Sequence, residues 1–151
     1  MTRTFTIILA IAALGGAAMA AEKLQMKDLP PAVQKTVTQE QAKGAEIKGL
    51  AKETENGKTS YEVETMVKGK HRDFLVDAKG AVTEVEEETA IESIPAAAKA
   101  AIQKKVADGK MGMVETMTRG GATFYEAAYT SKAGKKLEVL VKPDGTEVKD
   151  Q

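Results

Sequence analysis

One pattern occurs twice in this sequence of 151 residues. Residues 28–37 read DLPPAVQKTV and residues 93–102 read SIPAAAKAAI. In each, a residue that can cap a helix is followed by a large aliphatic residue, a proline and a run of small or aliphatic residues. Asp and Ser are good helix N-caps, and proline is tolerated in the first helical turn. The repeated opening therefore predicts two helices, each at the start of one of two similar units.

Apolar residues continue each opening at every fourth position, a spacing that puts them on one face of a helix. They are Leu29, Val33 and Val37 in the first unit, and Ile94, Ala98, Ile102 and Val106 in the second. Gly44 and Gly109 follow where a helix C-terminus favours a residue with positive φ. We therefore expect two helices of about fifteen residues, each with one narrow apolar stripe.

Segments with the composition of strands follow each predicted helix. They read AEIKGLAKET, TSYEVETMVK, HRDFLVDA and AVTEVEEE in the first unit, and MGMVETMTR, ATFYEAAYTS, KLEVLVK and TEVKD in the second. Loops with Asn-Gly, Gly-Gly and Asp-Gly lie between them and favour hairpins. The fold class that we expect is α+β, a tandem repeat of a helix followed by an antiparallel β-meander, with the helices packed on one face of the sheet.

The boundaries of the two units follow from this pattern. We expect the first unit at residues 21–88 and the second at residues 89–151. Only the short stretch from Glu88 to Glu92 lies between the last predicted strand of the first unit and the cap of the second helix. Such a short link favours one continuous sheet over two separate lobes.

Alternation of side chains along the strands predicts a sheet face covered by the helices and an open face. We assign Tyr61, Val63, Phe74, Val76, Leu137, Val139 and Val141 to the covered face. The opposite parity gives a mainly charged face with a few apolar residues. Its predicted partner-binding residues are Glu62, Glu64, Met66, Asp73, Leu75, Phe124, Glu126, Glu138 and Leu140. The parity of the first strand in each unit is ambiguous, and we expect a bulge near Gly49.

The first twenty residues have the features of a secretory signal peptide. MTRTF supplies a basic start, TIILAIAALGGAAMA supplies an uncharged apolar stretch, and Ala18-Met19-Ala20 fits the small-x-small cleavage pattern. The apolar run is too short and too rich in Gly and Ala for a membrane span. We expect a signal peptide at residues 1–20 and a periplasmic or secreted protein that has no membrane association after cleavage.

The composition excludes several functional classes. The chain has no cysteine, which excludes disulfides, zinc–thiolate sites and thiol nucleophiles. Its 22 basic residues balance 22 acidic ones, so no electrostatic argument favours nucleic acid or anionic lipid as a partner. We therefore expect no nucleic-acid partner.

Three features could suggest chemistry, and each has a more ordinary interpretation. His71, the only histidine, could form a base–carboxylate pair with Asp73, but no nucleophile completes it, and we expect a solvated histidine at a hairpin end. Residues 84–88 read EVEEE, and without the turn-defined oxygen spacing of calcium loops they indicate a solvated acidic strand edge.

The third feature is a methionine group. We expect Met111 and Met113 on one strand face with Met117 further along, a set that could hold copper(I), although packing is the usual role of methionine. The sequence predicts no catalytic residue, no metal ligand and no cofactor.

The residues also resemble a known family. The order LPPAVQKTV, NGKTSYEVE and DFLVDAKGAVTEVEEE is similar to the PepSY-like family of exported bacterial proteins, also described as beta-lactamase-inhibitor-like. IPAAAKAAI, YEAA and LEVLVKPDGTEV resemble it again. The resemblance implies helices on one sheet face and an opposite, concave face, which in the beta-lactamase inhibitor protein grips the enzyme. This chain differs from the inhibitor protein in lacking cysteine and in having few aromatic anchors.

The resemblance and the open face together give an expected function. We expect a non-enzymatic periplasmic module that binds or inhibits another protein of the cell envelope, such as a peptidase, through the open face of its sheet. The alternative is a periplasmic protein that binds a small ligand or a metal ion.

Overall fold

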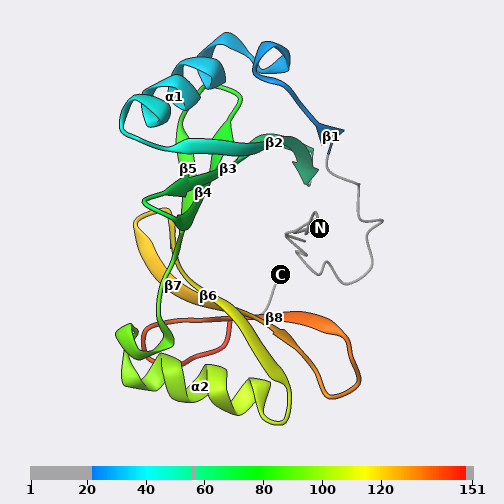
Figure 1. The fold of residues 1–151 in the computed structure, drawn as a ribbon, viewed down its shortest axis with the longest axis vertical. Coiled ribbons are helices and arrows are strands. Elements are labelled where there is room, and N and C mark those ends of the chain that lie inside the picture. The colour runs from blue at the N-terminus through cyan, green and yellow to red at the C-terminus, as the bar shows by residue number, and fades with distance from the viewer. Residues whose placement is uncertain (1–21, 56, 149–151) are drawn as a thin grey trace.

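The computed structural model describes residues 22–55 and 57–148, so the predicted signal peptide at residues 1–20 lies outside the described residues. The described strands form one eight-stranded antiparallel sheet in which each strand pairs with the next along the chain. Figure 1 shows the sheet bent into a crescent, with one α-helix on the outer side near each end. The expected α+β fold, with helices on one face of a continuous sheet, is confirmed.

The first half of the sheet follows the first helix. Its elements are β1 (Glu22–Lys23), the 3₁₀ turn η1 (Met26–Asp28), α1 (Pro31–Ala42), β2 (Glu46–Glu55), β3 (Lys58–Val67), β4 (Lys70–Asp77) and β5 (Val82–Glu88). The short strand β1 has no counterpart in the sequence prediction. The expected bulge is present, because the pairing of β2 with β3 shifts register between Ile47 and Gly49.

The second half repeats this order. Its elements are the 3₁₀ turn η2 (Ile91–Ser93), α2 (Ala96–Val106), β6 (Lys110–Arg119), β7 (Ala122–Thr130) and β8 (Lys136–Val141). The predicted strand TEVKD is not formed as such in the described part of the chain. It contributes an isolated bridge between Val141 and Glu147.

Both α-helices begin later than the sequence indicated. Pro30 and Pro95 occupy the N-cap positions, while Asp28 and Ser93 end the preceding 3₁₀ turns. The residue before a proline is disfavoured in the α conformation, and Leu29 is accordingly extended, with φ −76° and ψ 148°. The helices therefore contain 12 and 11 residues, fewer than expected.

The two helix C-termini differ. Gly44 has a φ of 101°, as expected for a residue after a helix. The same expectation is wrong for Gly109, because Ala107 takes the positive φ, 43°, in the second unit. Gly109 is suited to its position for another reason: a Cβ there would lie 2.6 Å from the carbonyl oxygen of Thr130.

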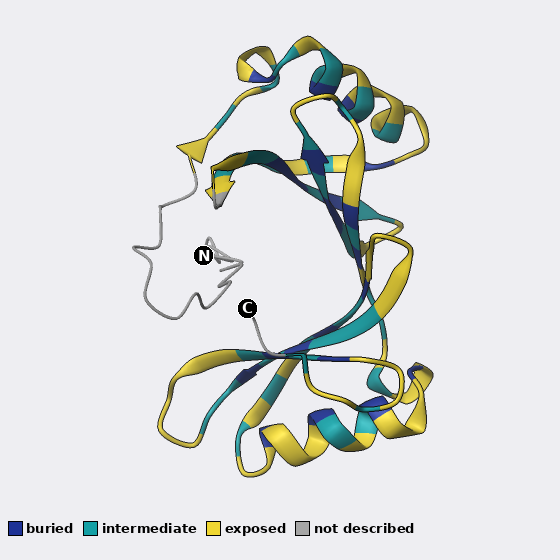
Figure 2. Cartoon of the chain, turned by 180° about the vertical axis from the view of Figure 1, so that it is seen from behind, coloured by how far each residue is buried: buried dark blue, intermediate teal, exposed yellow. Residues whose placement is uncertain are grey.

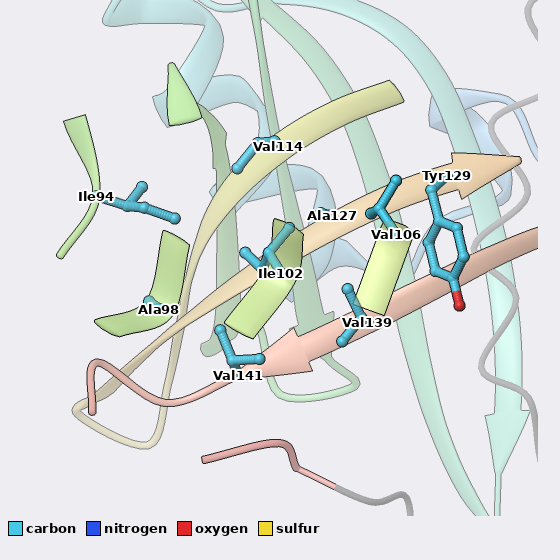
Figure 3. Close-up of a cluster of buried hydrophobic side chains, with 9 residues drawn as sticks. All are labelled: Ile94, Ala98, Ile102, Val106, Val114, Ala127, Tyr129, Val139 and Val141. Atoms are coloured by element: carbon cyan, nitrogen blue, oxygen red, sulfur yellow. The ribbon is translucent and has the colours of Figure 1, made fainter. Parts of the chain in front are cut away.

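The predicted apolar stripes of both helices are buried against the sheet. One cluster joins Leu29, Val33 and Val37 to Tyr61, Val63, Phe74 and Val76. The other, drawn in Figure 3, joins Ile94, Ala98, Ile102 and Val106 to Val114, Ala127, Tyr129, Val139 and Val141. Leu137 lies on the same face, opposite Tyr129, but it is 42 % exposed at the start of β8, where it is not covered.

In each unit, a glycine in a turn lies close against the helix, and its place is the same in the two units. A Cβ at Gly80 would lie 2.7 Å from the carbonyl oxygen of Ala32 in α1, and a Cβ at Gly145 would lie 2.6 Å from that of Ala97 in α2. Both glycines have positive φ, 86° and 83°. Only a residue without a side chain fits both the conformation and the close approach.

Candidate functional site

The sheet face opposite the helices lines the inner side of the crescent, and we call it the concave face. Its residues follow from the cross-strand pairs, which include Glu62 with Leu75, Glu86 with Met117 and Glu126 with Leu140. Among its members are Glu62, Glu64, Asp73, Leu75, Glu84, Glu86, Glu115, Met117, Arg119, Phe124, Glu126 and Leu140. Carboxylates and apolar side chains are thus interleaved across it.

The structure places the predicted partner-binding residues on this face but does not leave them all solvated. Glu62 and Asp73 are buried. The others are half-buried, and they are Glu64, Met66, Leu75, Phe124, Glu126, Glu138 and Leu140. Their role in binding a partner remains a prediction.

The expectation for residues 84–88 is wrong. This segment is β5, which pairs with β4 on one side and β6 on the other, so it lies in the middle of the sheet and forms no edge. Glu84 and Glu86 are consequently only 5 % and 7 % exposed. Figure 2 shows buried residues in the middle of the sheet as well as beneath the helices. The central strand therefore contributes carboxylates to the floor of the concave face.

A small hollow lies in this floor. Its walls are formed by the side chains of β3, β4 and β5, namely Glu62, Asp73, Phe74, Leu75, Glu84 and Glu86. Four of these six residues carry a carboxyl group, and all four are buried. The hollow is therefore acidic, and its carboxyl-bearing residues are largely buried.

Two of the four carboxylates have partners within the chain. Glu84 pairs with the guanidinium of Arg119, its cross-strand neighbour on β6. Asp73 accepts a hydrogen bond from the backbone N–H of Thr65, with a donor–acceptor distance of 2.7 Å. These contacts compensate the removal of both groups from water.

Glu62 and Glu86 differ from these two. Each is 7 % exposed, and among the described residues neither accepts a hydrogen bond nor forms an ion pair. Burial raises the pKa of Glu62 to about 8, and repulsion by Glu53, Glu64 and Asp73 adds to the shift. No fully buried side-chain oxygen of the described residues lacks a hydrogen-bond partner, so the carboxyl oxygens of Glu62 and Glu86 still reach the surface of the hollow.

Burial and repulsion between like charges also raise the pKa of carboxyl groups on β5 and β6. Burial raises the pKa of Glu86 to about 9, with repulsion by Glu126 and Glu115 next in size. Burial also raises the pKa of Glu115 to about 7, and its directly opposed neighbour Glu126 adds to the rise. Like charges directly opposite on antiparallel strands are destabilising. The acidic region therefore extends from β3 to β7.

Apolar side chains are part of the same surface. Met117 is buried between Glu86 and Phe124 in the cross-strand row. The expectation that Met111 shares a face with Met117 is wrong: Met111 packs against the core beneath α2. A register shift between Met111 and Val114 reverses the parity of the strand. The methionines are therefore divided between the two faces of the sheet.

The histidine pair that the sequence suggested does not form an isolated dyad. The Asp73 carboxylate is bound to Thr65, and the backbone N–H of His71 donates to the Glu88 carboxylate at 3.1 Å. Within residues 22–55 and 57–148, no three acidic or histidine side chains converge in a way that would hold a metal ion. The arrangement is that of a surface on which acidic and apolar side chains alternate.

Sequence reasoning missed five residues of this surface. They are Glu84, Glu86, Glu115, Met117 and Arg119. The alternation in EVEEE was the available signal, because Glu84, Glu86 and Glu88 share one parity. Placing them on the concave face required knowing that β5 pairs with β6.

None of the helices in the described residues is long and apolar enough to cross a membrane. No family model matches the chain, and no curated protein matches its sequence. The comparison that identifies its class is therefore the fold: two helix-and-meander units in one crescent-shaped sheet, with the helices outside and the acidic floor inside.

Several solved structures of Bacteroides proteins have a similar fold. A BLIP-like protein of Bacteroides fragilis is 19% identical, with a TM-score of 0.55, and the match covers 82% of this chain and 86% of that one. A protein of Bacteroides eggerthii described as one of the "putative periplasmic proteins" is 16% identical, with a TM-score of 0.63 over 82% and 88% of the two chains. A DUF2874 family protein of Bacteroides uniformis is 14% identical, with a TM-score of 0.61 over 80% and 86%.

These likenesses show the fold. The beta-lactamase-inhibitor-like architecture that the sequence resembles is thereby confirmed for this chain.

Proposed function

We propose that this chain is a non-enzymatic periplasmic protein that binds another protein of the cell envelope through its concave face. The observation that carries the proposal is the floor of that face, where buried carboxylates alternate with apolar side chains on the side that the helices leave uncovered. Glu62 and Glu86 have no partner among the described residues and still reach the surface of the hollow, so such a floor is suited to a ligand that supplies hydrogen-bond donors.

The fold supports the same surface. The solved structures of similar fold include a BLIP-like protein. The family resemblance of the sequence implies the same surface, because the beta-lactamase inhibitor protein contacts its enzyme with the concave face. The periplasmic location rests on the predicted signal peptide and on a similar fold described as periplasmic. The geometry supports binding of a protein. The proposed partner is an enzyme or another protein of the envelope.

Photo-crosslinking in the living envelope tests this function. A photoreactive phenylalanine analogue placed at Phe124 or Leu140 lies on the concave face, and one placed at Gln103 lies on the exposed side of α2. We expect one protein to be crosslinked from the two concave positions and not from Gln103. The partner, identified by mass spectrometry and purified, should then bind the unmodified chain directly.

Two results would contradict the proposal. One is crosslinking from Gln103 alone, which would place the interface on the helices. The other is a purified partner that shows no binding. A thermal-shift screen with small molecules and metal ions tests the alternative function, because a ligand that binds only the folded state raises the melting temperature.

A further inference from the structure

Two carboxyl groups on the concave face belong to largely buried residues, have no partner among the described residues and reach the surface of one hollow. Glu62 comes from β3 and Glu86 from β5, and both line the hollow beside Leu75 of the strand between them. Each is 7 % exposed, without a hydrogen bond or ion pair among the described residues. Ionising either group at this position is costly, so a cationic ligand that pairs with the two carboxylates would stabilise their charged forms.

The charges around the hollow all favour a cation. Asp73 and Glu84 line it together with Glu62 and Glu86, and Glu115 and Glu126 face each other further along the same surface. Arg119 approaches from β6, but its guanidinium is paired with Glu84. A positive group entering the hollow would be attracted by the carboxylates around it and would favour the ionised forms of Glu62 and Glu86.

The apolar lining indicates which cation fits. Phe74 and Leu75 form part of the wall, and Met117 and Phe124 continue the floor in the neighbouring row. A hydrated metal ion gains nothing from such contacts, and the described acidic residues do not converge as metal ligands. Lys and Arg side chains, by contrast, bury their aliphatic stems on apolar surface while the head remains hydrogen-bonded. Arginine can also donate to two carboxylates in a fixed geometry.

We propose that the concave face recognises an extended basic segment of its partner protein, with an arginine or lysine side chain entering the hollow between Glu62 and Glu86. This inference rests on the proposed function and specifies the chemistry of the partner. Further basic side chains of the segment would lie over Glu115 and Glu126, and its apolar residues would contact Met117 and Phe124.

Fluorescence anisotropy with labelled peptides tests the inference directly. The probes are an extended peptide in which arginine alternates with serine, and a matched peptide in which neutral citrulline replaces each arginine. We expect the folded chain to bind the arginine peptide at least about tenfold more tightly, because only arginine supplies the positive charge. We expect E62Q and E86Q each to weaken binding of the arginine peptide by about tenfold.

The matched control is E92Q. Glu92 is exposed in η2, so its substitution changes the net charge by the same amount without altering the concave face. We expect E92Q to bind as the wild type does. E62Q and E86Q should also raise the melting temperature while they weaken binding, whereas loss of a merely structural residue lowers both. Circular dichroism verifies that each variant is folded. If a glutamine variant unfolds, Glu86→Met is tested in its place.

Three results of the peptide assay would overturn the inference: equal binding of the citrulline peptide, equal loss of binding in all three variants, or displacement of the peptide by spermidine at the same concentration. The last would indicate a small polyamine as the ligand. A crosslinked partner that binds through the concave face with a non-basic segment would overturn this inference and leave the proposed function intact. Arginine-peptide binding without any concave-face crosslink would contradict the proposed function instead.

Discussion

The guanidinium of Arg119 on β6 forms an ion pair with the carboxylate of Glu84, its cross-strand neighbour on β5. Glu84 is buried, and the Arg119 side chain is about half exposed. The pair joins the two strands at which the first helix-and-meander unit meets the second. Removing the cation would leave a buried carboxylate without a partner in the centre of the sheet.

R119A should therefore lower the free energy of unfolding by roughly 1–3 kcal/mol, measured by urea denaturation. Addition of E84Q to R119A should recover most of the loss, because the buried group is then neutral. If the double variant is no more stable than R119A, the ion pair is not the cause.

The stability of the wild-type protein should fall as the pH rises from about 5 to about 8. The pKa of Glu62 is raised from 4.5 to about 8, that of Glu86 to about 9 and that of Glu115 to about 7. In this range the folded state binds protons that the unfolded state has released. Raising the pH therefore lowers the free energy of unfolding. Calorimetry should give a higher melting temperature at about pH 5 than at about pH 8. A melting temperature that rises over this range would contradict the burial of these groups.

E62Q and E86Q should each stabilise the protein at about pH 8, by on the order of 1 kcal/mol, and have little effect at about pH 5. The glutamine side chain has the same shape and carries no charge, and at the lower pH the native carboxyl group already holds its proton. Denaturation curves at the two pH values measure the difference. E92Q is the control, because Glu92 is exposed. A stabilisation by E62Q that is independent of pH would exclude ionisation as the reason.

G145A should destabilise the protein more than G134A does. Both glycines have similar positive φ, 83° and 80°. A Cβ at Gly145 would lie 2.6 Å from the carbonyl oxygen of Ala97, whereas a Cβ at Gly134 would have no atom within 4 Å. We expect a loss of about 1 kcal/mol for G134A and of roughly 3 kcal/mol or more for G145A, from chemical denaturation. Equal losses of stability would mean that the close approach of Gly145 to α2 adds nothing to the cost of a side chain there.

I102A should cost about 2–5 kcal/mol of unfolding free energy, because Ile102 is fully buried between α2 and the sheet (Figure 3). K104A, at an exposed position of the same helix, should change it by less than about 0.5 kcal/mol. Urea denaturation of the two variants measures the contribution of the α2 core. A small effect of I102A would show that α2 packs loosely on the sheet.

The sequence by itself determined the elements whose signals are local. The separation of four residues between Val33 and Val37, and between Ala98 and Ile102, identified the buried faces of the helices. Turn residues and alternation placed β2 to β8 to within a few residues. A helix stripe or a hairpin depends on neighbours that lie close in the chain, so its pattern is visible without the fold.

Only the tertiary structure decided which charges are buried. Glu84 and Glu86 resemble a solvated edge in the sequence, and they become the floor of a hollow because β5 pairs with β6 beyond an entire helix. In the same way, the register shift before Val114 moved Met111 to the opposite face from Met117. Pairing of strands that are separated by a helix depends on contacts distant in the chain, and one residue of shift reverses every side chain that follows. Alternation therefore revealed that the carboxylates share a face, and the sheet as a whole decided that they are largely buried.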